Sequence, residues 1–162
     1  MNCSLPITLL RPGAVLPTYA TPGAAALDLC AAPDVSLTLN PGTSALVPTG
    51  LAVAIPQGYV GLLFARSGLA VRQGLCLANG VGVIDSDYRG ELCVALLNLG
   101  EQPISITGKM RIAQLALLPV AQAALDLRPS LDSTQRGAGG FGSTGLAPLE
   151  PEGASSGRKG GL

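Results

Sequence analysis

Residues 35–65 read VSLTLNPGTSALVPTGLAVAIPQGYVGLLFA, and in this stretch short apolar segments alternate with groups of turn residues. The breaks fall at 40–42, 48–50 and 56–58, where Pro and Gly interrupt the apolar pattern. Short runs rich in Val, Ile and Leu between such breaks are typical of β-strands. The stretch therefore predicts an all-β sandwich or barrel rather than alternating βαβ units.

The same pattern extends toward the C-terminus in ELCVALLNLG (91–100), PISITG (103–108) and RIAQLALLPV (111–120). The 13 prolines and 22 glycines of the chain fit a fold with many turns. Only SGLAVRQGL (67–75) has a helical pattern, with Ser67 as the predicted N-cap and Gly74 as the predicted end. We expect one short helix within a β protein.

Composition narrows the class of partner. The 162 residues carry a formal net charge of zero, and only 12% of them are charged. No basic surplus favours duplex nucleic acid or an anionic membrane surface. No run reaches the roughly 18 apolar residues that span a bilayer, and the N-terminus lacks the basic region of a secretory signal. We expect a cytoplasmic protein, and its mean hydropathy of +0.44 indicates an oligomer.

Cysteine and histidine usage excludes several chemistries. The chain has no histidine, and its four cysteines are scattered without a C-x-x-C pair, at Cys3, Cys30, Cys76 and Cys93. A zinc site needs clustered ligands, and Ser-His or Cys-His nucleophile pairs need histidine. The cysteines are therefore interpreted as reduced, buried thiols of a cytosolic protein.

A candidate phosphate site lies at the start of the predicted helix. Arg66 offers a bidentate guanidinium, Ser67 a hydroxyl, and Gly68 a backbone N–H at a helix N-terminus. The alternative is a plain capped helix with a surface arginine.

The stretch NGVGVIDSDYRGE (79–91) holds the candidate base-reading hairpin. If it forms a strand, Asp85 and Asp87 face the same side, with Asp85 partly buried as a general base beside the Tyr88 ring. Asn79 and the backbone around Gly82 offer paired donors and acceptors to a base edge. The alternative is a hairpin whose Asp and Arg side chains are solvated.

Two further polar positions interrupt apolar segments. Asp28 in ALDLCA is either an acid at a strand rim or a carboxylate that holds magnesium-bound waters. Gln114, which shares the strand-like RIAQL with Arg111, is either a satisfied core amide or a phosphate contact.

The glycine-rich RGAGGFGSTG (136–145) predicts a mobile arm after the core. Arg136 and the pair Ser143-Thr144 suit phosphate oxygens, and Phe141 suits stacking on a base. The alternative is a disordered linker with one stray aromatic. Residues 146–162 have no periodicity and predict a loose tail.

Five stretches in order, AALDLCA, ARSGLA, NGVGVIDSDYRGE, RIAQL and RGAGGFGSTG, resemble the motifs of the trimeric dUTP diphosphatase (dUTPase) family. The resemblance covers about residues 5–145. It implies a distorted β-barrel or jelly-roll-like sandwich with one short helix, a homotrimer, and active sites built from three subunits with Mg²⁺. The implied reaction converts dUTP to dUMP and pyrophosphate, which keeps uracil out of DNA and supplies dUMP for thymidylate synthesis.

The resemblance also implies a role for each matching position. Asp85 activates the attacking water, Tyr88 lies under the deoxyribose, and Asp28 lies near the metal-bound waters. The remaining implied substrate contacts are the phosphate group of Arg66, Ser67, Gly68 and Gln114, the uracil-reading group of Asn79, Gly82, Val83, Ile84 and Cys93, and the arm residues Arg136, Phe141, Gly142, Ser143 and Thr144. Asp28, Gln114 and Arg136 join Asp85 as implied catalytic positions.

The implied organisation is a core over 1–135, a closing arm over 136–145 and a tail over 146–162. Two backbone positions depart from the family pattern, with Ala26 in place of Gly and Ala65 in place of Pro. The alternatives are an enzyme like dCTP deaminase, which shares the fold and the Arg-Ser motif, and a trimer that binds nucleotide without turnover.

Overall fold

The computed structural model describes residues 3–141 and 143. Twelve strands and one helix form within these residues: β1 (Ile7–Leu9), β2 (Thr18–Tyr19), β3 (Leu27–Cys30), β4 (Ser36–Leu39), β5 (Ser44–Pro48), β6 (Leu51–Val53), β7 (Tyr59–Ala65), α1 (Ser67–Gln73), β8 (Leu75–Leu77), β9 (Gly82–Ile84), β10 (Cys93–Asn98), β11 (Ile104–Thr107) and β12 (Arg111–Pro119). The prediction of an all-β fold with one short helix is confirmed.

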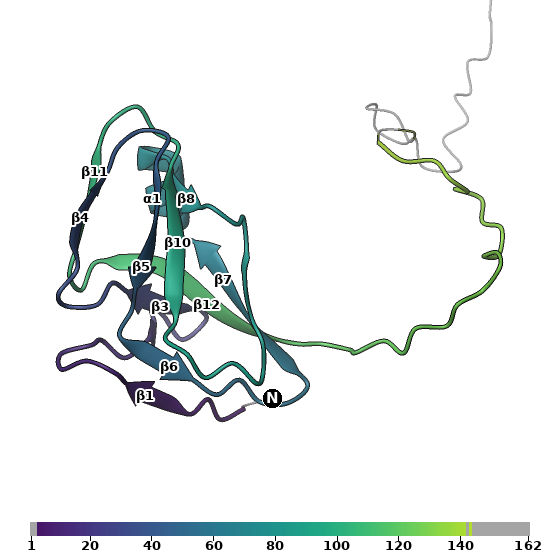
Figure 1. The fold of residues 1–162 in the computed structure, drawn as a ribbon, viewed down its shortest axis with the longest axis horizontal. Coiled ribbons are helices and arrows are strands. Elements are labelled where there is room, and N and C mark those ends of the chain that lie inside the picture. The colour runs from purple at the N-terminus through teal and green to yellow at the C-terminus, as the bar shows by residue number, and fades with distance from the viewer. Residues whose placement is uncertain (1–2, 142, 144–162) are drawn as a thin grey trace, which may run out of the picture. The chain divides into compact units, whose positions relative to one another are not determined.

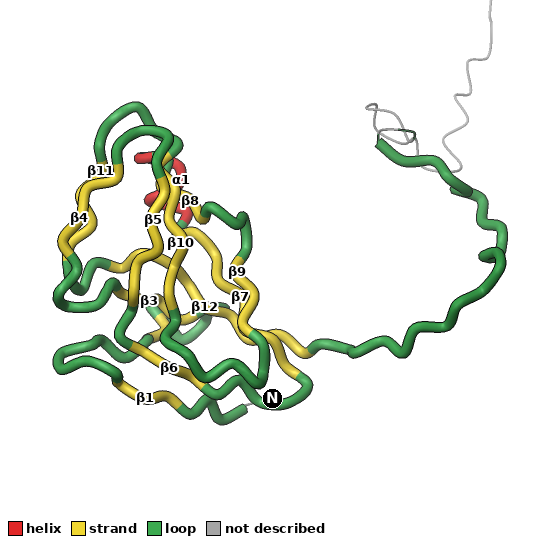
Figure 2. The backbone as a smooth tube through the Cα atoms, in the orientation of Figure 1, coloured by secondary structure: helices red, strands yellow, loops and turns green. Residues whose placement is uncertain are grey.

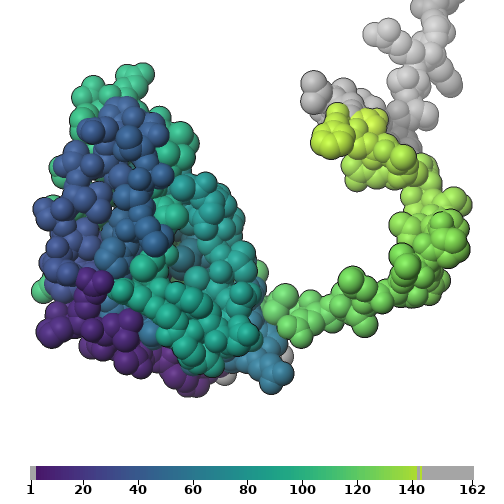
Figure 3. Space-filling model, in the orientation of Figure 1, coloured from purple at the N-terminus to yellow at the C-terminus, as the bar shows by residue number. Residues whose placement is uncertain are grey.

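The chain divides into two units, Met1–Gln122 and Ala123–Leu162. The first unit holds every strand and the helix, and Figure 3 shows its N-terminal segment (purple) along one edge. The described residues of the second unit form loop and turn without strand or helix (Figure 2). The predicted boundary between core and arm at 135 and 136 stays a prediction, and the predicted tail lies outside the described residues.

The strands pair into four antiparallel sheets, shown in Figure 1. A five-stranded sheet has the order β2-β3-β12-β7-β9, and a three-stranded sheet has the order β5-β10-β8. Two-stranded pairs join β1 to β6 and β11 to β4. The described strands do not close into a barrel, so the sandwich is the better description of the predicted architecture.

Alternation of side chains explains how these strands bury one core. Along β10, half-buried and buried residues alternate from Cys93 to Asn98, as expected for a strand with one face inward. The core gathers aliphatic side chains from both larger sheets, including Leu29, Val47, Leu51, Leu63, Leu75, Val94, Leu96, Ile106, Ile112 and Leu115.

One buried polar side chain fixes the end of β10. Asn98 is fully buried, and its Nδ2 donates to the backbone oxygens of Leu39 at 2.9 Å and Gln102 at 2.8 Å. Its Oδ1 accepts from the Gly100 backbone N–H at 2.8 Å. The amide thereby satisfies three backbone groups that no strand ladder reaches.

The helix begins differently from the prediction. Arg66 is the N-cap, and no side chain caps the helix, so the capping role predicted for Ser67 is wrong. The predicted end is confirmed, since Gly74 is the C-cap at φ 72°, where a Cβ would lie 2.4 Å from the Gly100 nitrogen. No helix among the described residues is long and apolar enough to cross a membrane.

Candidate active site

A buried carboxylate joins three of the motifs. Asp28 on β3 has a side chain only 4% exposed, and its Oδ1 accepts from Arg66 Nε and Gln114 Nε2, each at 3.2 Å. Its Oδ2 accepts from Arg111 Nη1 at 3.0 Å. We call these four residues the Asp28 cluster. Because two arginines share one carboxylate, the cluster carries a net charge of +1, which favours an anion beside it.

An irregularity in β12 brings the cluster together. Arg111 lies opposite Cys30 and Ala113 lies opposite Leu29, so β12 carries one extra residue between them. In a regular strand, residues 111 and 114 would face opposite sides of the sheet. The extra residue is a β-bulge, which re-aims side chains, and it lets both Arg111 and Gln114 reach Asp28.

The predicted phosphate-binding residues lie beside this cluster. Arg66 also donates from Nη1 to the Arg111 backbone oxygen at 3.4 Å, so both arginines are held together. Ser67 and Gly68 in the first turn of α1 are exposed, and a Cβ on Gly68 would meet nothing within 4 Å. A ligand can therefore approach this turn closely.

The predicted uracil-reading residues line one small cavity. It has a volume of about 180 Å³ and lies between β9 and β10, with Asn79, Gly82, Val83, Ile84 and Cys93 in its wall. Pockets for drug-sized ligands start near 300 Å³, so this cavity suits a single ring.

Gly82 lets β9 approach its neighbour closely. A Cβ at Gly82 would lie 2.9 Å from the Leu63 Cβ on β7, which is closer than real side chains come. Glycine is therefore required for the hairpin to pair with β7 in this register.

A second cavity of about 290 Å³ shares Val83, Ile84 and Cys93 with the first and adds Asp85 and Tyr88. The Tyr88 hydroxyl donates to the Glu91 backbone oxygen at 3.0 Å, and the ring lies where a Cβ on Gly90 would otherwise sit. Tyr88 is therefore held in place beside the small cavity.

Asp85 differs from its predicted setting. Strand β9 ends at Ile84, so Asp85 and Asp87 lie in a turn rather than on a strand, and both are exposed rather than partly buried. No described side chain donates a hydrogen bond to the Asp85 carboxylate. The carboxylate remains available to a ligand or water.

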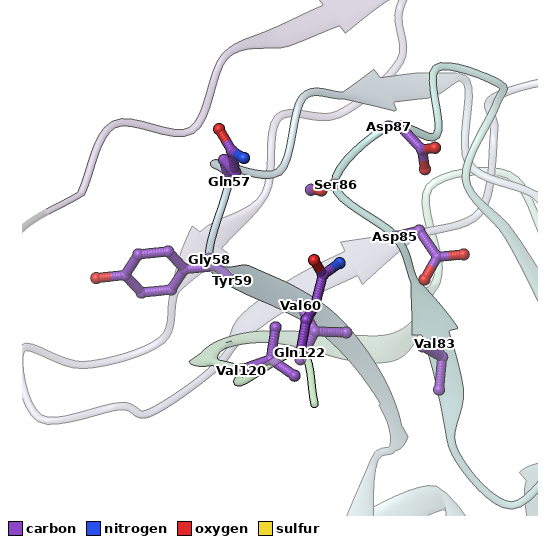
Figure 4. Close-up of a pocket in the computed structure, with 10 residues that line it drawn as sticks. All are labelled: Gln57, Gly58, Tyr59, Val60, Val83, Asp85, Ser86, Asp87, Val120 and Gln122. Carbon is purple, nitrogen blue, oxygen red and sulfur yellow. The ribbon is translucent and has the colours of Figure 1, made fainter. Parts of the chain in front are cut away.

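Figure 4 shows Asp85 just beyond the arrow of β9, which carries Val83. This side of the turn faces a wider cavity of about 630 Å³, lined also by Tyr59, Ser86 and Asp87. The Tyr59 ring points away from Asp85 (Figure 4). Because this cavity contains only Val83 and Asp85 of the predicted site residues, we assign the base site to the smaller cavity.

Asp85 and the Asp28 cluster lie at opposite ends of β7. Ile84 pairs with Gly61, and Arg66 directly follows Ala65, the last residue of β7. Asp85 thus lies level with residue 60, about six residues from Arg66, or about 20 Å at about 3.3 Å per residue. One chain does not bring these predicted site residues together.

The described arm residues are exposed. Arg136 Nε donates to the Gly139 backbone oxygen at 3.0 Å, and Phe141 is fully exposed with φ at 48°. Ser143 is also exposed, whereas Gly142 and Thr144 lie outside the described residues. An exposed phenylalanine gains no packing within its own unit.

The cysteines are free thiols, as predicted, although only Cys30 is buried and Cys3 is exposed. Burial raises the pKa of Cys30, and the Asp28 charge adds to this; burial also raises the pKa of Cys93. In the described part of the chain, no three Cys, Asp or Glu side chains gather as metal ligands.

The dUTPase family model matches residues 13–145. The chain belongs to the dUTPase family. A deoxyuridine 5'-triphosphate nucleotidohydrolase of Desulfitobacterium hafniense (strain DSM 10664 / DCB-2) is 56% identical over 133 residues, covering 82% of this chain and 88% of that protein. One of Roseobacter denitrificans (strain ATCC 33942 / OCh 114) is 56% identical over 131 residues, covering 80% and 86%.

Solved structures of the family share the fold. A dUTPase of Staphylococcus bacteriophage 80alpha with bound dUpNHpp has a TM-score of 0.82 at 27% identity, covering 90% of this chain and all of that one. A dUTPase from phage phi11 of S. aureus, solved with attention to a structural Mg(II) ion, has a TM-score of 0.72 at 25% identity, covering 79% and 98%. The resemblance to this family is thus confirmed.

Sequence reasoning gave no role to two residues of these sites. Arg111 was noted only as a polar residue in an apolar strand, and its link to Asp28 depends on a bulge that periodicity does not reveal. Leu46 borders both smaller cavities and is 66% exposed, but nothing in its strand pattern marks it.

Proposed function

We propose that this chain hydrolyses dUTP to dUMP and pyrophosphate. The observation that carries the proposal is the small hairpin cavity with the Asp85 carboxylate directly beside it. Membership of the dUTPase family supports the same substrate and reaction.

In the proposed complex, the uracil ring occupies the 180 Å³ cavity. The Asn79 amide and the backbone of β9 provide donors and acceptors to the ring edge, and the confined wall leaves no space for a 5-methyl group. The deoxyribose lies on Tyr88, whose hydroxyl is anchored to Glu91 and whose ring excludes a 2′-hydroxyl. Base and sugar are thus read by rigid elements of the hairpin.

The Asp85 carboxylate acts as the general base. It accepts a proton from a water molecule while the water oxygen bonds to the α-phosphorus and the bond to the bridging oxygen of the leaving pyrophosphate breaks. Arg66, Gln114 and the first turn of α1 bind the phosphates and offset the charge that moves onto pyrophosphate.

Mg²⁺ is the cofactor of the proposed reaction and neutralises triphosphate charge when bound. The described residues offer no cage of three ligands, which fits a magnesium ion held mainly by phosphate oxygens and water. The prediction that Asp28 contacts its waters stays a prediction.

We further propose that each site combines residues of different subunits in a homotrimer, with the arm carrying Arg136, Phe141 and Ser143 closing over the nucleotide. The roughly 20 Å that separates Asp85 from Arg66 along β7 supports this, because one triphosphate cannot use both residues of one chain. Exposed Phe141 supports the closing role of the arm.

The reaction is tested by pyrophosphate release from dUTP with Mg²⁺, with dTTP and UTP as specificity controls. We expect turnover of dUTP and at least a hundredfold preference over both controls. A preparation that releases no pyrophosphate from dUTP, or that releases ammonia from dCTP, overturns the proposal.

Subunit sharing is tested by complementation between two inactive variants. Asp85→Asn and Arg66→Ala chains are co-expressed with different tags, and mixed oligomers are isolated through both tags. If each site takes Asp85 and Arg66 from different chains, about one quarter of the sites in an even mixture are intact. Sites within single chains would leave every mixture inactive, and this result would refute sharing.

A further inference from the structure

We propose that Arg111 is a further substrate-binding residue, which pairs with Arg66 to clamp the two phosphates that leave as pyrophosphate, and that Asp28 is the positioning residue for both arginines. The inference rests on the proposed function. It replaces a metal-linked role for Asp28 with an electrostatic one and gives Arg111 a contact with substrate.

The carboxylate of Asp28 is already committed to protein donors. A carboxylate has about four lone-pair positions, and three of them accept bonds from Arg66, Gln114 and Arg111. Its side chain is 4% exposed, so water bound to a metal has no open approach to it in this chain. This geometry suits a fixed anchor.

The two arginines differ in exposure from their anchor. The side chain of Arg66 is 25% exposed and that of Arg111 is 54% exposed, whereas both point their inner nitrogens at Asp28. A guanidinium carries five N–H donors, and Arg111 uses one of them within the described chain. Its remaining donors face outward in a planar fork that matches phosphate oxygens.

The bulge in β12 argues that this arrangement is built. An extra strand residue interrupts the ladder beside the cluster, and its effect is to turn Arg111 toward Asp28. A regular strand would direct Arg111 to the opposite face from Gln114. A residue needed only for solubility would not require this change of register.

Charge explains why a single buried acid serves two cations. The lone carboxylate offsets one arginine, and the second positive charge is left for a ligand. Because Asp28 fixes both side chains beforehand, the phosphates are met without the entropy cost of ordering two flexible arginines.

The experiment compares Arg111→Ala and Arg111→Lys with wild type and with Arg72→Ala, an exposed control that removes the same charge from the last turn of α1. Affinity is measured for dUpNHpp, dUMP and inorganic pyrophosphate, and KM and kcat for dUTP. For Arg111→Ala we expect dUpNHpp and pyrophosphate binding to weaken about 10- to 100-fold, the usual effect of losing charged hydrogen bonds, with dUMP affinity unchanged within about twofold. Arg111→Lys should recover only part of the loss, because lysine lacks the planar fork.

The positioning role is tested with Asp28→Asn, alone and combined with Arg111→Ala. We expect the single variant to weaken dUpNHpp binding and the combined effect to be less than additive, since both changes disable one clamp. The Arg111 variants decide the clamp even if Asp28→Asn fails to fold.

The inference is overturned if Arg111→Ala binds dUpNHpp as Arg72→Ala does, or if its affinities for dUMP and dUpNHpp fall equally, which marks a structural effect. Asp28→Asn that alters only the Mg²⁺ concentration needed for turnover would also overturn it. These outcomes differ from failure of the proposed function, in which wild type itself releases no pyrophosphate.

Discussion

Replacing Asp85 with asparagine separates chemistry from folding in this protein. The side chain is exposed, lies after β9, and accepts no hydrogen bond from a described side chain, so its loss removes no contact of the fold. The free energy of unfolding should stay within about 0.5 kcal/mol of wild type. Turnover of dUTP should fall about 10²- to 10⁴-fold, which corresponds to about 2.7–5.4 kcal/mol of lost transition-state stabilisation.

Asp87→Asn is the matched control, because Asp87 is also exposed and lies in the same turn, two residues away. Both variants are assayed by steady-state pyrophosphate release with Mg²⁺ and by chemical denaturation. Asp87→Asn should stay within about threefold of wild-type turnover, since it lies outside the smaller cavities that hold the base and sugar. Asp85→Asn with more than a tenth of wild-type turnover, or an equal loss in both variants, would refute the role of Asp85.

Three further outcomes are expected. Deletion of 136–162 should reduce turnover at least a hundredfold while circular dichroism and the unfolding midpoint stay unchanged, and Phe141→Ala should lose activity without loss of stability, because Phe141 is fully exposed. Asn98→Ala should lower the free energy of unfolding by about 3 kcal/mol or more in denaturant titrations, at about 1 kcal/mol for each of three buried partners left unsatisfied. In mass spectrometry after timed iodoacetamide treatment, exposed Cys3 should be alkylated first and Cys30 last, since burial shields that thiol and raises its pKa above the usual value, so less thiolate forms at a given pH.

The class of fold follows from features that act over a few residues. Turn residues at 40–42, 48–50 and 56–58 separate the segments that become β4, β5, β6 and β7. The helix end at Gly74 was predictable for the same reason, because only glycine fits a left-handed φ at such a close approach to Gly100. Local backbone preference and global packing agree at these points.

The errors arise where tertiary contacts override local preference. Ser67 has the chemistry of an N-cap, but Arg66 occupies that position because its side chain is held by Asp28. The sequence of 82–87 reads as a continuous strand, yet pairing with β7 ends at Ile84 and Asp85 turns outward. Sequence spacing therefore identified the residues of the hairpin but not their exposure.

Motif order also hides which motifs meet. The first, second and fourth motifs converge on Asp28 because β12 lies between β3 and β7 in the five-stranded sheet, and no residue count along the chain reveals this order. The third motif lies on β9, the edge strand, whose antiparallel pairing with β7 carries Asp85 away from Arg66. A single fold thus makes two rigid half-sites without joining them, since β7 is too stiff to bring its ends together. On the proposed mechanism, assembly of chains is the step that completes the site, and mutations at a subunit interface should then abolish turnover while each half-site keeps its own geometry.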